Sequence, residues 1–462
     1  MEIRKLYQHQ RQAVKRATEG NLALFHECGT GKTLTALKII EHHKAKGCGP
    51  ALVVCPLSII EAAWMADAAE FSPELKVVSL WAKTRQKRLE ALNRDADIYI
   101  INFESFRGLF SEIQAKGFEV LIVDESSKMK SHSSQITRAL LALAGVYSRG
   151  KGKRFGVNRP VAHRYILTGT PAPNDRSEYW AQITFIAPGE VFSDNFFAFR
   201  GRYFTAKPLG RTGISLWSFT DEKWLADEFS ERMAPVCDVV SKEDAVDLPE
   251  QVHEIRKVKL SQNEQAAYDR FRRDFVLRFA DEEVLATTAL TELMKARQLT
   301  SGFCYGREGI HLLGKSKLKE LKDLLDEIGN KSVIIWCNFQ QEVELLLREI
   351  PDSVALWGGT DDRQAVIKQF KAGSATRLIA NPQSAAHGLT FVNAANAIYY
   401  SMTYSYELMK QSQDRIHRIG QNTKCTYHYL LADGTIDEVI YQAVQEKKDL
   451  SEAVLQYLKN GN

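Results

Sequence analysis

The sequence predicts an α/β protein built from two parallel sheets, each covered by helices, with additional helical insertions. Apolar segments of strand length alternate with amphipathic segments of helix length, which is the pattern of a parallel sheet with helices on both faces. This alternation ends before residue 170 and begins again near residue 330. The chain has 462 residues, of which 44% are hydrophobic and 26% are charged, enough for two to four domains with ample cores.

The first alternating region contains five expected strands and three expected helices. The strands are expected at residues 22–25, 51–55, 98–101, 120–123 and 164–167, and the helices at residues 33–46, 59–71 and 134–144. His42 and His43 fall on the first of these helices and are predicted to lie at the surface. The spacing of the eleven histidines is not typical of metal ligands.

The second alternating region predicts a second sheet. Its strands are expected at residues 333–337, 354–356, 377–380 and 397–400, and its helices at residues 340–349, 363–371 and 406–418. Residues 260–296 are predicted to be strongly helical. Residues 178–233 are rich in aromatic side chains, which are predicted to pack in a core or protrusion rather than stack on bases. Residues 242–249 are predicted to be an exposed connector, so the expected domains are residues 1–245 and 246–462.

Bulk properties exclude some classes of protein. The net charge of +4 is compatible with a nucleic-acid partner but does not prove one. The seven cysteines form no Cys-x-x-Cys pair, which fits a reducing cytoplasm. Neither a signal region nor a membrane-spanning segment is visible. We therefore expect a cytoplasmic protein, and we expect it to be a monomer. Residues 145–164 carry six basic side chains among glycines. A solvated loop and a contact with a phosphate backbone are equally good interpretations of this insertion.

A phosphate-binding loop is predicted where the first strand meets the first helix. Gly29, Thr30, Gly31, Lys32 and Thr33 stand in order at this junction. Glycines allow backbone N–H groups to turn toward phosphate oxygens, and the helix N-terminus adds its dipole. Lys32 is predicted to contact the β- and γ-phosphates, and the Thr33 hydroxyl to bind Mg²⁺. His26 occupies the place of the first glycine of the strict pattern.

Two carboxylates are predicted to complete this site. Asp124 and Glu125 directly follow the apolar strand at residues 120–123. Because ligands of parallel sheets bind at the carboxyl ends of strands, both side chains are expected near the phosphate loop. Asp124 is predicted to reach Mg²⁺, and Glu125 to orient and deprotonate an attacking water.

Two arginines near the end of the chain are predicted to act on the same nucleotide. Arg415 and Arg418 are three residues apart on the predicted helix at residues 406–418 and would share one face of it. Arginines placed in this way neutralise charge on a γ-phosphate during its transfer. The predicted site therefore draws on both halves of the chain and suggests motion driven by a nucleotide.

These segments together resemble the motifs of the Swi/Snf-like ATPases of helicase superfamily two, of the compact bacterial or phage type. The similarity extends over nearly the whole chain. Its motifs stand at residues 9–14, 29–33, 53–58, 101–104, 124–128, 167–174, 333–339, 380–390, 411–421 and 434–438. The chain departs from the family at Ser126 and Ser127, which replace a common Gly-His pair, and at His387.

The resemblance implies two RecA-like lobes of the P-loop NTPase type, with a C-terminal brace helix. It implies that Gln10 reads adenine, and that Gly388 and Gln411 belong to the ATP site. ATP and Mg²⁺ are the implied cofactors. It also implies that duplex DNA is bound through its backbone, and the residues expected to contact phosphates are Ser58, Thr168, His387 and Thr390.

The resulting hypothesis is a DNA-dependent ATPase that moves along duplex DNA in replication, recombination or repair of a phage or bacterium, with a replication or repair protein as its expected partner. Three alternatives stay open at this point. One is a helicase that separates DNA strands, and another is an RNA-dependent ATPase. The third is a nucleotide-gated scaffold that holds DNA for a partner nuclease.

Overall fold

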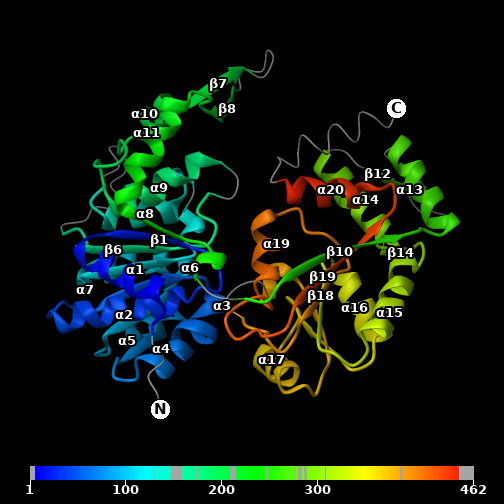
Figure 1. The fold of residues 1–462 in the computed structure, drawn as a ribbon, viewed down its shortest axis with the longest axis horizontal. Helices are drawn as coiled ribbons and strands as arrows, with labels where there is room; N and C mark the ends of the chain where they lie inside the picture. The colour runs from blue at the N-terminus through cyan, green and yellow to red at the C-terminus, as the bar shows by residue number, and fades with distance from the viewer. Residues whose placement is uncertain are drawn as a thin grey trace. The chain divides into compact units, whose positions relative to one another are not determined.

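A computed structural model gives the arrangement of the chain (Figure 1). It divides the protein into two compact units, residues 1–247 and 248–462. The described residues are 6–129, 131–146, 159–172, 175–208, 215–245, 248–274, 276–278, 283–285, 289–306, 309–385 and 389–446.

The first unit is built on a parallel sheet of seven strands in the order β3-β4-β2-β5-β6-β1-β9. Alternate residues of each central strand enter different cores: Leu121 and Val123 join one cluster, while Val120 and Ile122 join the other. Burial on both faces explains why these strands are continuously apolar in sequence. The strands are β1 (Leu22–His26), β2 (Ala51–Cys55), β3 (Val77–Ser79), β4 (Ile98–Asn102), β5 (Val120–Asp124), β6 (His163–Leu167) and β9 (Cys237–Val240).

Helices cover both faces of this sheet (Figure 1). They are α1 (Gln8–Glu19), α2 (Lys32–Ala45), α3 (Leu57–Ile59), α4 (Ala66–Phe71), α5 (Arg85–Leu92), α6 (Phe103–Gly108), α7 (Phe110–Lys116), α8 (Gln135–Leu143), α9 (Tyr179–Ile186), α10 (Phe196–Tyr203), α11 (Lys223–Met233) and α12 (Lys242–Ala245). A π-helical turn, Ile60–Met65, joins α3 to α4. An antiparallel hairpin of β7 (Phe204–Pro208) and β8 (Ser215–Phe219) lies between α10 and α11.

The second unit is built on a parallel sheet of six strands in the order β10-β19-β18-β15-β17-β16. Its strands are β10 (Gln251–Val258), β15 (Val333–Trp336), β16 (Ser353–Leu356), β17 (Arg377–Ala380), β18 (Asn396–Tyr399) and β19 (Cys425–Ala432). Its helices are α13 (Gln262–Asp274), α14 (Ala289–Thr300), α15 (Ser316–Ile328), α16 (Gln340–Glu349), α17 (Arg363–Ala372), α18 (Pro382–Ala385), α19 (Tyr406–Gln413) and α20 (Ile436–Gln445). Two parallel sheets with helices confirm the predicted fold class of two RecA-like lobes.

A buried ion pair connects α15 to α20 in the second unit. Lys317 Nζ lies 2.5 Å from Asp437 Oδ2, and both side chains are almost inaccessible, at 1% and 2% exposure. The Asp437 carboxylate also accepts hydrogen bonds from the Thr300 hydroxyl and the Ala432 N–H. Lys317 donates a further bond to the Tyr400 carbonyl. Both charges are therefore fully surrounded by partners, which is the condition for an ion pair to exist inside a core.

Several predicted segments differ from the structure. Residues 260–296 are not one helical region, because β11 (Val276–Arg278) and β12 (Glu283–Leu285) form a hairpin between α13 and α14. Residues 242–249 are not simply an exposed connector, because α12 begins at Lys242, which is buried. The Lys242 N–H donates to a carboxylate oxygen of Glu27, so this segment is tied to the loop after β1.

The aromatic side chains of residues 178–233 pack largely as predicted. Phe199, Tyr203 and Phe204 are buried in the core of the first unit, whereas Phe197 is 63% exposed. Phe192 and Phe229 are stacked, with ring centroids 5.0 Å apart. Packing of these rings against one another explains the high aromatic content of the segment.

Candidate nucleotide site

The loop between β1 and α2 has the backbone that a phosphate cradle needs. Gly29 and Gly31 have φ values of 88° and 82°, in the left-handed region that favours glycine. Gly31 is the N-cap of α2, so the first helical N–H groups follow it directly. The buried Thr30 hydroxyl donates to the Glu27 carbonyl at 2.8 Å and fixes the turn. This geometry gives a phosphate the N–H groups and the dipole of a helix N-terminus.

Lys32 lies over the loop that it follows. Its Nζ atom donates to the carbonyl oxygens of His26 at 2.7 Å and Glu27 at 3.1 Å. The ammonium is therefore held at the position where the loop turns, rather than extended into solvent. Thr33, in the first turn of α2, is half-buried. Lys32 and Thr33 thus start the same helix from the same loop, as the predicted roles require.

Gln10 holds the loop from the side of α1. Its Nε2 donates to the carbonyl oxygens of Thr30 at 3.4 Å and Gly31 at 3.2 Å, while its Oε1 accepts the Tyr7 N–H at 2.9 Å. The His9 ring also contacts the Thr30 carbonyl at 2.9 Å. The structure therefore shows Gln10 positioning the phosphate loop, and its predicted reading of adenine stays a prediction.

Replacing Gly31 with alanine is expected to raise the KM for ATP about tenfold. A side chain in left-handed backbone costs roughly 1–2 kcal/mol, and about 1.4 kcal/mol corresponds to a factor of ten. A Cβ atom at Gly31 would also lie 2.3 Å from Gln10 Nε2, so Gln10 would have to leave the loop. Turnover measured against ATP concentration checks the expectation.

Gly20→Ala is the matched control, because a Cβ atom at Gly20 meets nothing within 4 Å and its backbone is extended. An unchanged KM in Gly31→Ala would show that the loop does not need this conformation to bind ATP.

The two carboxylates lie at the same edge of the sheet as the loop. Asp124 ends β5 and His26 ends β1, and β6 separates these parallel strands. Asp124 is buried and accepts hydrogen bonds from Trp64 Nε1 and the Glu125 N–H, each at 2.9 Å. Burial raises the pKa of Asp124, while the Trp64 hydrogen bond and the charge of Lys32 act in the opposite direction. Lys32 is therefore close enough to act on Asp124, so the phosphate loop and the end of β5 lie near each other in the first unit.

Glu125 has an unusual backbone. Its φ is 55°, which is uncommon for a residue other than glycine and is strained. Such conformations persist only where the surrounding structure imposes them, and they concentrate at functional sites. The turn redirects the chain into a short 3₁₀ helix, Ser126–Met129, directly after β5.

The arginines of the second unit lie outside a helix, so the predicted helix at residues 406–418 is wrong in its last turns. Helix α19 ends at Gln413, and Arg415 and Arg418 follow in turns. Arg415 is buried and donates to the carbonyls of Gln411 and Leu389, each at 2.8 Å. Arg418 reaches the Leu389 carbonyl at 3.5 Å. A shared carbonyl, rather than a shared helical face, brings the two arginines together.

The remaining predicted site residues have different degrees of exposure. Gln411 is buried, and its Nε2 donates to Glu407 at 3.3 Å. Ser58 is exposed on α3, and Thr390 is half-buried. Thr168 is buried and its hydroxyl accepts the Thr170 N–H, so in this conformation it does not face a ligand. His387 and Gly388 lie outside the described residues.

Two predictions about polar side chains need correction. His43 is not at the surface: it is buried, and its Nε2 lies 2.7 Å from the Tyr165 hydroxyl. In the basic insertion, Arg164 is buried and donates to the carbonyls of Val161, Phe185 and Ile186. Arg164 therefore contributes to the core and not to a phosphate contact, while residues 147–158 lie outside the described part of the chain.

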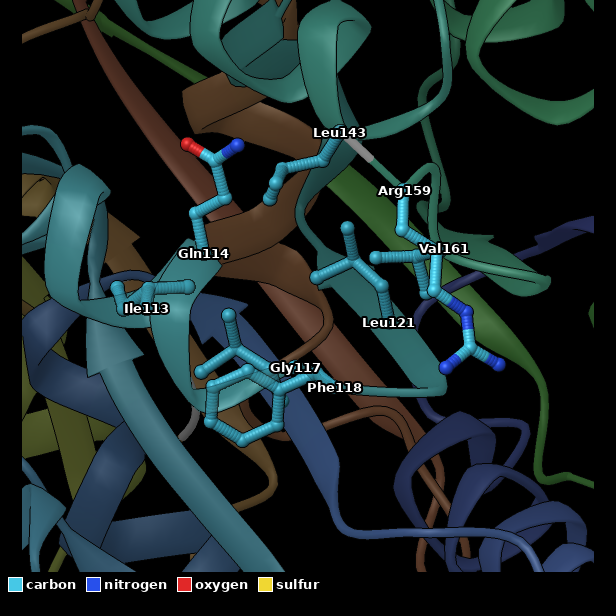
Figure 2. A pocket seen from close by; sticks show the side chains of 9 residues that line it. Ile113, Gln114, Gly117, Phe118, Leu121, Leu143, Arg159 and Val161 are labelled. Atoms are coloured by element: carbon cyan, nitrogen blue, oxygen red, sulfur yellow. The ribbon is translucent and has the colours of Figure 1, made fainter. Parts of the chain in front are cut away.

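A small apolar hollow lies elsewhere in the first unit (Figure 2). It is lined by side chains that include Ile113, Leu121, Leu143 and Val161. Leu121 is near the amino end of β5, whereas the phosphate loop follows the carboxyl end of β1. The hollow is therefore at the opposite edge of the parallel sheet and is not the nucleotide site.

Comparisons with known proteins identify the family. Residues 7–303 match the SNF2-related domain, and residues 316–420 match the helicase conserved C-terminal domain. The protein p41 of Acyrthosiphon pisum secondary endosymbiont phage 1 is 25% identical over 93% of both chains. YwqA of Bacillus subtilis, whose name describes a candidate ATP-dependent helicase/translocase, is 23% identical over 94% of this chain. This chain spans 46% of the length of YwqA.

Among solved structures, the Sulfolobus solfataricus SWI2/SNF2 ATPase core in complex with dsDNA is similar, with a TM-score of 0.45 and 19% identity. The similarity covers 96% of this chain and 91% of that one. None of the described helices is both long and apolar enough to cross a bilayer. The two domain matches also confirm the predicted enzyme class, an ATP hydrolase. The chain belongs to the SNF2-related family of helicase-like ATPases.

Proposed function

We propose that the chain is a DNA-dependent ATPase that couples ATP hydrolysis to movement along duplex DNA. The observation that carries the proposal is the approach of Lys32 to Asp124 at the carboxyl edge of the first sheet. An ammonium on a glycine loop near a buried carboxylate is the arrangement that binds a nucleotide triphosphate together with a divalent cation. Membership of the SNF2-related family supports the same reading.

The residues of the first unit have distinct roles in this proposal. The phosphates of ATP take over the interactions that the His26 and Glu27 carbonyls make with Lys32. Mg²⁺, held by the Thr33 hydroxyl and the Asp124 carboxylate, supplies neutralising charge to the phosphates when bound. The donor set fits this ion, because hydroxyl and carboxylate oxygens are the ligands that Mg²⁺ prefers. Glu125 orients the attacking water and accepts its proton.

The second unit supplies positive charge to the transition state. Arg415 and Arg418 neutralise the charge on the transferred phosphoryl group. Gln411, whose carbonyl accepts from Arg415, positions that guanidinium. Gly388 and the adenine-reading role of Gln10 are proposed to complete the nucleotide contacts. Ser58, Thr168, His387 and Thr390 are proposed to meet the DNA backbone, and Thr168 must become exposed to do so.

Duplex DNA is expected to raise ATP turnover about tenfold or more, because aligning arginines on a phosphoryl group is worth several orders of magnitude. Turnover is measured with no nucleic acid, single-stranded DNA, duplex DNA, forked DNA and RNA. Backbone contacts also predict that stimulation falls as salt rises, with little dependence on DNA sequence. Negligible turnover with every nucleic acid would contradict the proposal and favour a nucleotide-gated scaffold.

Two displacement assays separate translocation from strand separation. A duplex translocase displaces the third strand of a triplex but leaves a forked duplex annealed, whereas a strand-separating helicase unwinds the fork. Stronger stimulation by RNA than by DNA would instead identify an RNA-dependent ATPase.

The proposed setting is replication, recombination or repair of DNA in a phage or bacterium, with the protein acting as a cytoplasmic monomer that cooperates with a replication or repair protein. The similarity to a phage protein over nearly its whole length supports this setting. Sensitivity of a deletion strain to DNA damage tests the role, and light scattering of the purified protein tests the oligomeric state.

A further inference from the structure

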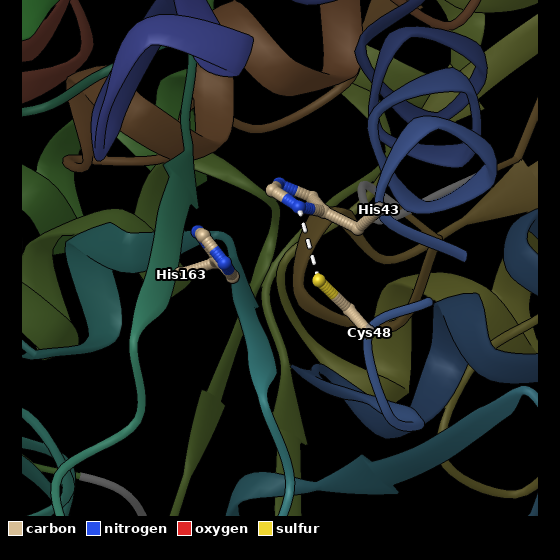
Figure 3. A group of neighbouring side chains, drawn as sticks. All are labelled: His43, Cys48 and His163. Atoms are coloured by element: carbon tan, nitrogen blue, oxygen red, sulfur yellow. Dashed lines mark hydrogen bonds between the residues drawn. The ribbon is translucent and has the colours of Figure 1, made fainter. Parts of the chain in front are cut away.

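Two histidines and one cysteine meet at the amino end of β6. His43 lies near the end of α2, Cys48 lies in the loop that follows, and His163 is the first residue of β6. Their side chains point toward a common space (Figure 3). One ligand atom from each residue can be chosen so that all three lie within 4.8 Å of one another. The sequence gives no spacing signal for this group, because His163 is far from the other two along the chain.

Hydrogen bonds define which nitrogen of His43 faces the cysteine. The Tyr165 hydroxyl donates to the Ala17 carbonyl at 2.8 Å, so its oxygen accepts from His43 Nε2 at 2.7 Å. With the proton on Nε2, the lone pair is on Nδ1, which lies 3.8 Å from Cys48 Sγ. Histidines that bind metals in proteins usually donate their other ring N–H to a fixed acceptor in this way.

The spacing of the atoms suits a tetrahedral ion. Zn²⁺ bonds of about 2.3 Å to sulfur and about 2.0 Å to nitrogen place these two ligands about 3.6 Å apart. The observed separation of 3.8 Å between Cys48 Sγ and His43 Nδ1 is close to that value. The rings of His43 and His163 lie with centroids 4.1 Å apart, and a ligand nitrogen of His163 lies within 4.8 Å of the other two ligand atoms.

Charged side chains of both signs lie around this cluster. His43 is buried and hydrogen-bonded through Nε2, which leaves its Nδ1 atom on the side of Cys48. Glu119 and Arg164 both lie close enough to His163 for their opposite charges to act on its ring. The Glu119 carboxylate is held by the Gly49 N–H at 2.9 Å. One carboxylate therefore lies beside the two imidazoles and the thiol, and it also pairs with Arg159 at 3.5 Å.

We propose that His43, Cys48 and His163 form a binding site for a divalent metal ion of the Zn²⁺ class. Two imidazole nitrogens and one thiolate suit Zn²⁺ or Co²⁺ and are poor ligands for Mg²⁺. Binding releases the thiol proton of Cys48 to solvent, and water occupies the fourth position. This site is separate from the proposed Mg²⁺ ligands Thr33 and Asp124.

The position of the site indicates a structural role. Helix α2 starts at the phosphate loop, and His43 is eleven residues further on, about 16 Å along the helix axis. Strand β6 likewise runs from His163 to Leu167, next to Thr168 at the opposite edge of the sheet. An ion held here ties the far end of α2, which begins at the phosphate loop, to the far end of β6, which lies between the two strands that lead into the nucleotide site. It stabilises the first unit without touching ATP.

Cobalt titration of the chelator-treated full-length protein tests the site. We expect one Co²⁺ per chain, an absorption band from thiolate-to-cobalt charge transfer, and loss of that band when Zn²⁺ is added. Cys48→Ser is expected to remove the band, and His163→Gln to weaken Co²⁺ binding by about 100-fold or more, because losing a ligand costs at least as much as losing an outer-shell partner. Cys28→Ser and His42→Gln are the matched controls, since neither residue belongs to the cluster, and both should retain the band.

Thermal unfolding provides an independent readout. Zn²⁺ is expected to raise the Tm of the wild-type protein by about 3 °C or more, and to leave that of Cys48→Ser unchanged. Tyr165→Phe should weaken binding about tenfold, because His43 loses the acceptor that fixes its tautomer. Absence of the charge-transfer band in the wild-type protein, or equal Co²⁺ affinity in Cys48→Ser, would overturn the proposal. Neither result bears on ATP hydrolysis.

Discussion

Lys32→Ala is expected to lower kcat/KM for ATP about 10³-fold while leaving the fold intact. Removing one preorganised charge that stabilises a transition state commonly costs 10²–10³-fold in rate, and Lys32 also contributes to ATP binding. Its ammonium already lies on the carbonyls of His26 and Glu27, so it is in place before ATP arrives. Steady-state turnover with saturating duplex DNA measures the change.

Lys44→Ala is the matched control for this prediction. Lys44 lies on the same helix, at its far end, and pairs with Asp97 at 2.7 Å near the surface. Its loss should leave turnover nearly unchanged, since exposed ion pairs contribute little to stability. Circular dichroism and Tm verify that both variants fold. Native turnover in Lys32→Ala would show that the phosphate loop is assigned to the wrong segment.

Asp437→Ala is expected to have the largest effect on stability, about 3–5 kcal/mol. The substitution leaves the Lys317 ammonium buried at 1% exposure without its counter-ion, which is far more costly than losing a surface pair. It also removes the acceptor for the Thr300 hydroxyl and the Ala432 N–H. The change should lower the Tm of the second unit by about 10 °C. Urea denaturation followed by fluorescence of the native tryptophans measures the free energy of unfolding.

The neighbouring acid provides a sharp comparison. Glu438 pairs with Lys257 at 3.1 Å, but Lys257 is 63% exposed. Glu438→Gln should therefore cost less than about 1 kcal/mol. In Lys317→Met/Asp437→Leu, both charges are replaced by apolar groups, and most of the lost stability should return. Equal losses in Asp437→Ala and Glu438→Gln would mean that the buried pair adds nothing beyond a surface contact.

The phosphate loop and β5 were predictable because local chemistry determines them. Gly29 and Gly31 are required by a left-handed backbone, and four apolar residues before Asp124 specify a strand buried on both faces. By contrast, β10 was missed because His253, Glu254 and Arg256 interrupt its apolar pattern. That strand lies at the edge of its sheet, so within the described part of the chain it has β19 as a neighbour on one side and no strand on the other.

The features that sequence patterns did not reveal depend on tertiary contacts. Helical spacing predicted a common face for Arg415 and Arg418, but both instead reach the carbonyl of Leu389, which lies well before them in the chain. The sequence around His43 is polar and predicts exposure, yet the ring is buried and bonded to the Tyr165 hydroxyl of β6, a strand far away along the chain. No local signal marks such positions, because the partner that determines them belongs to another element.

The π-helical turn after α3 connects a residue proposed to contact DNA with a residue bonded to a proposed Mg²⁺ ligand. Ser58, proposed to meet DNA, and Trp64, whose indole is bonded to Asp124, stand on one uninterrupted stretch of helical backbone. A shift of this stretch on binding DNA would alter the hydrogen bond from Trp64 to the carboxylate proposed for Mg²⁺. Thermodynamic reciprocity then requires that the cation alter the affinity for DNA by the same factor. The hydrogen bond from Trp64 to Asp124 is therefore the contact through which the proposed DNA and Mg²⁺ sites would be coupled.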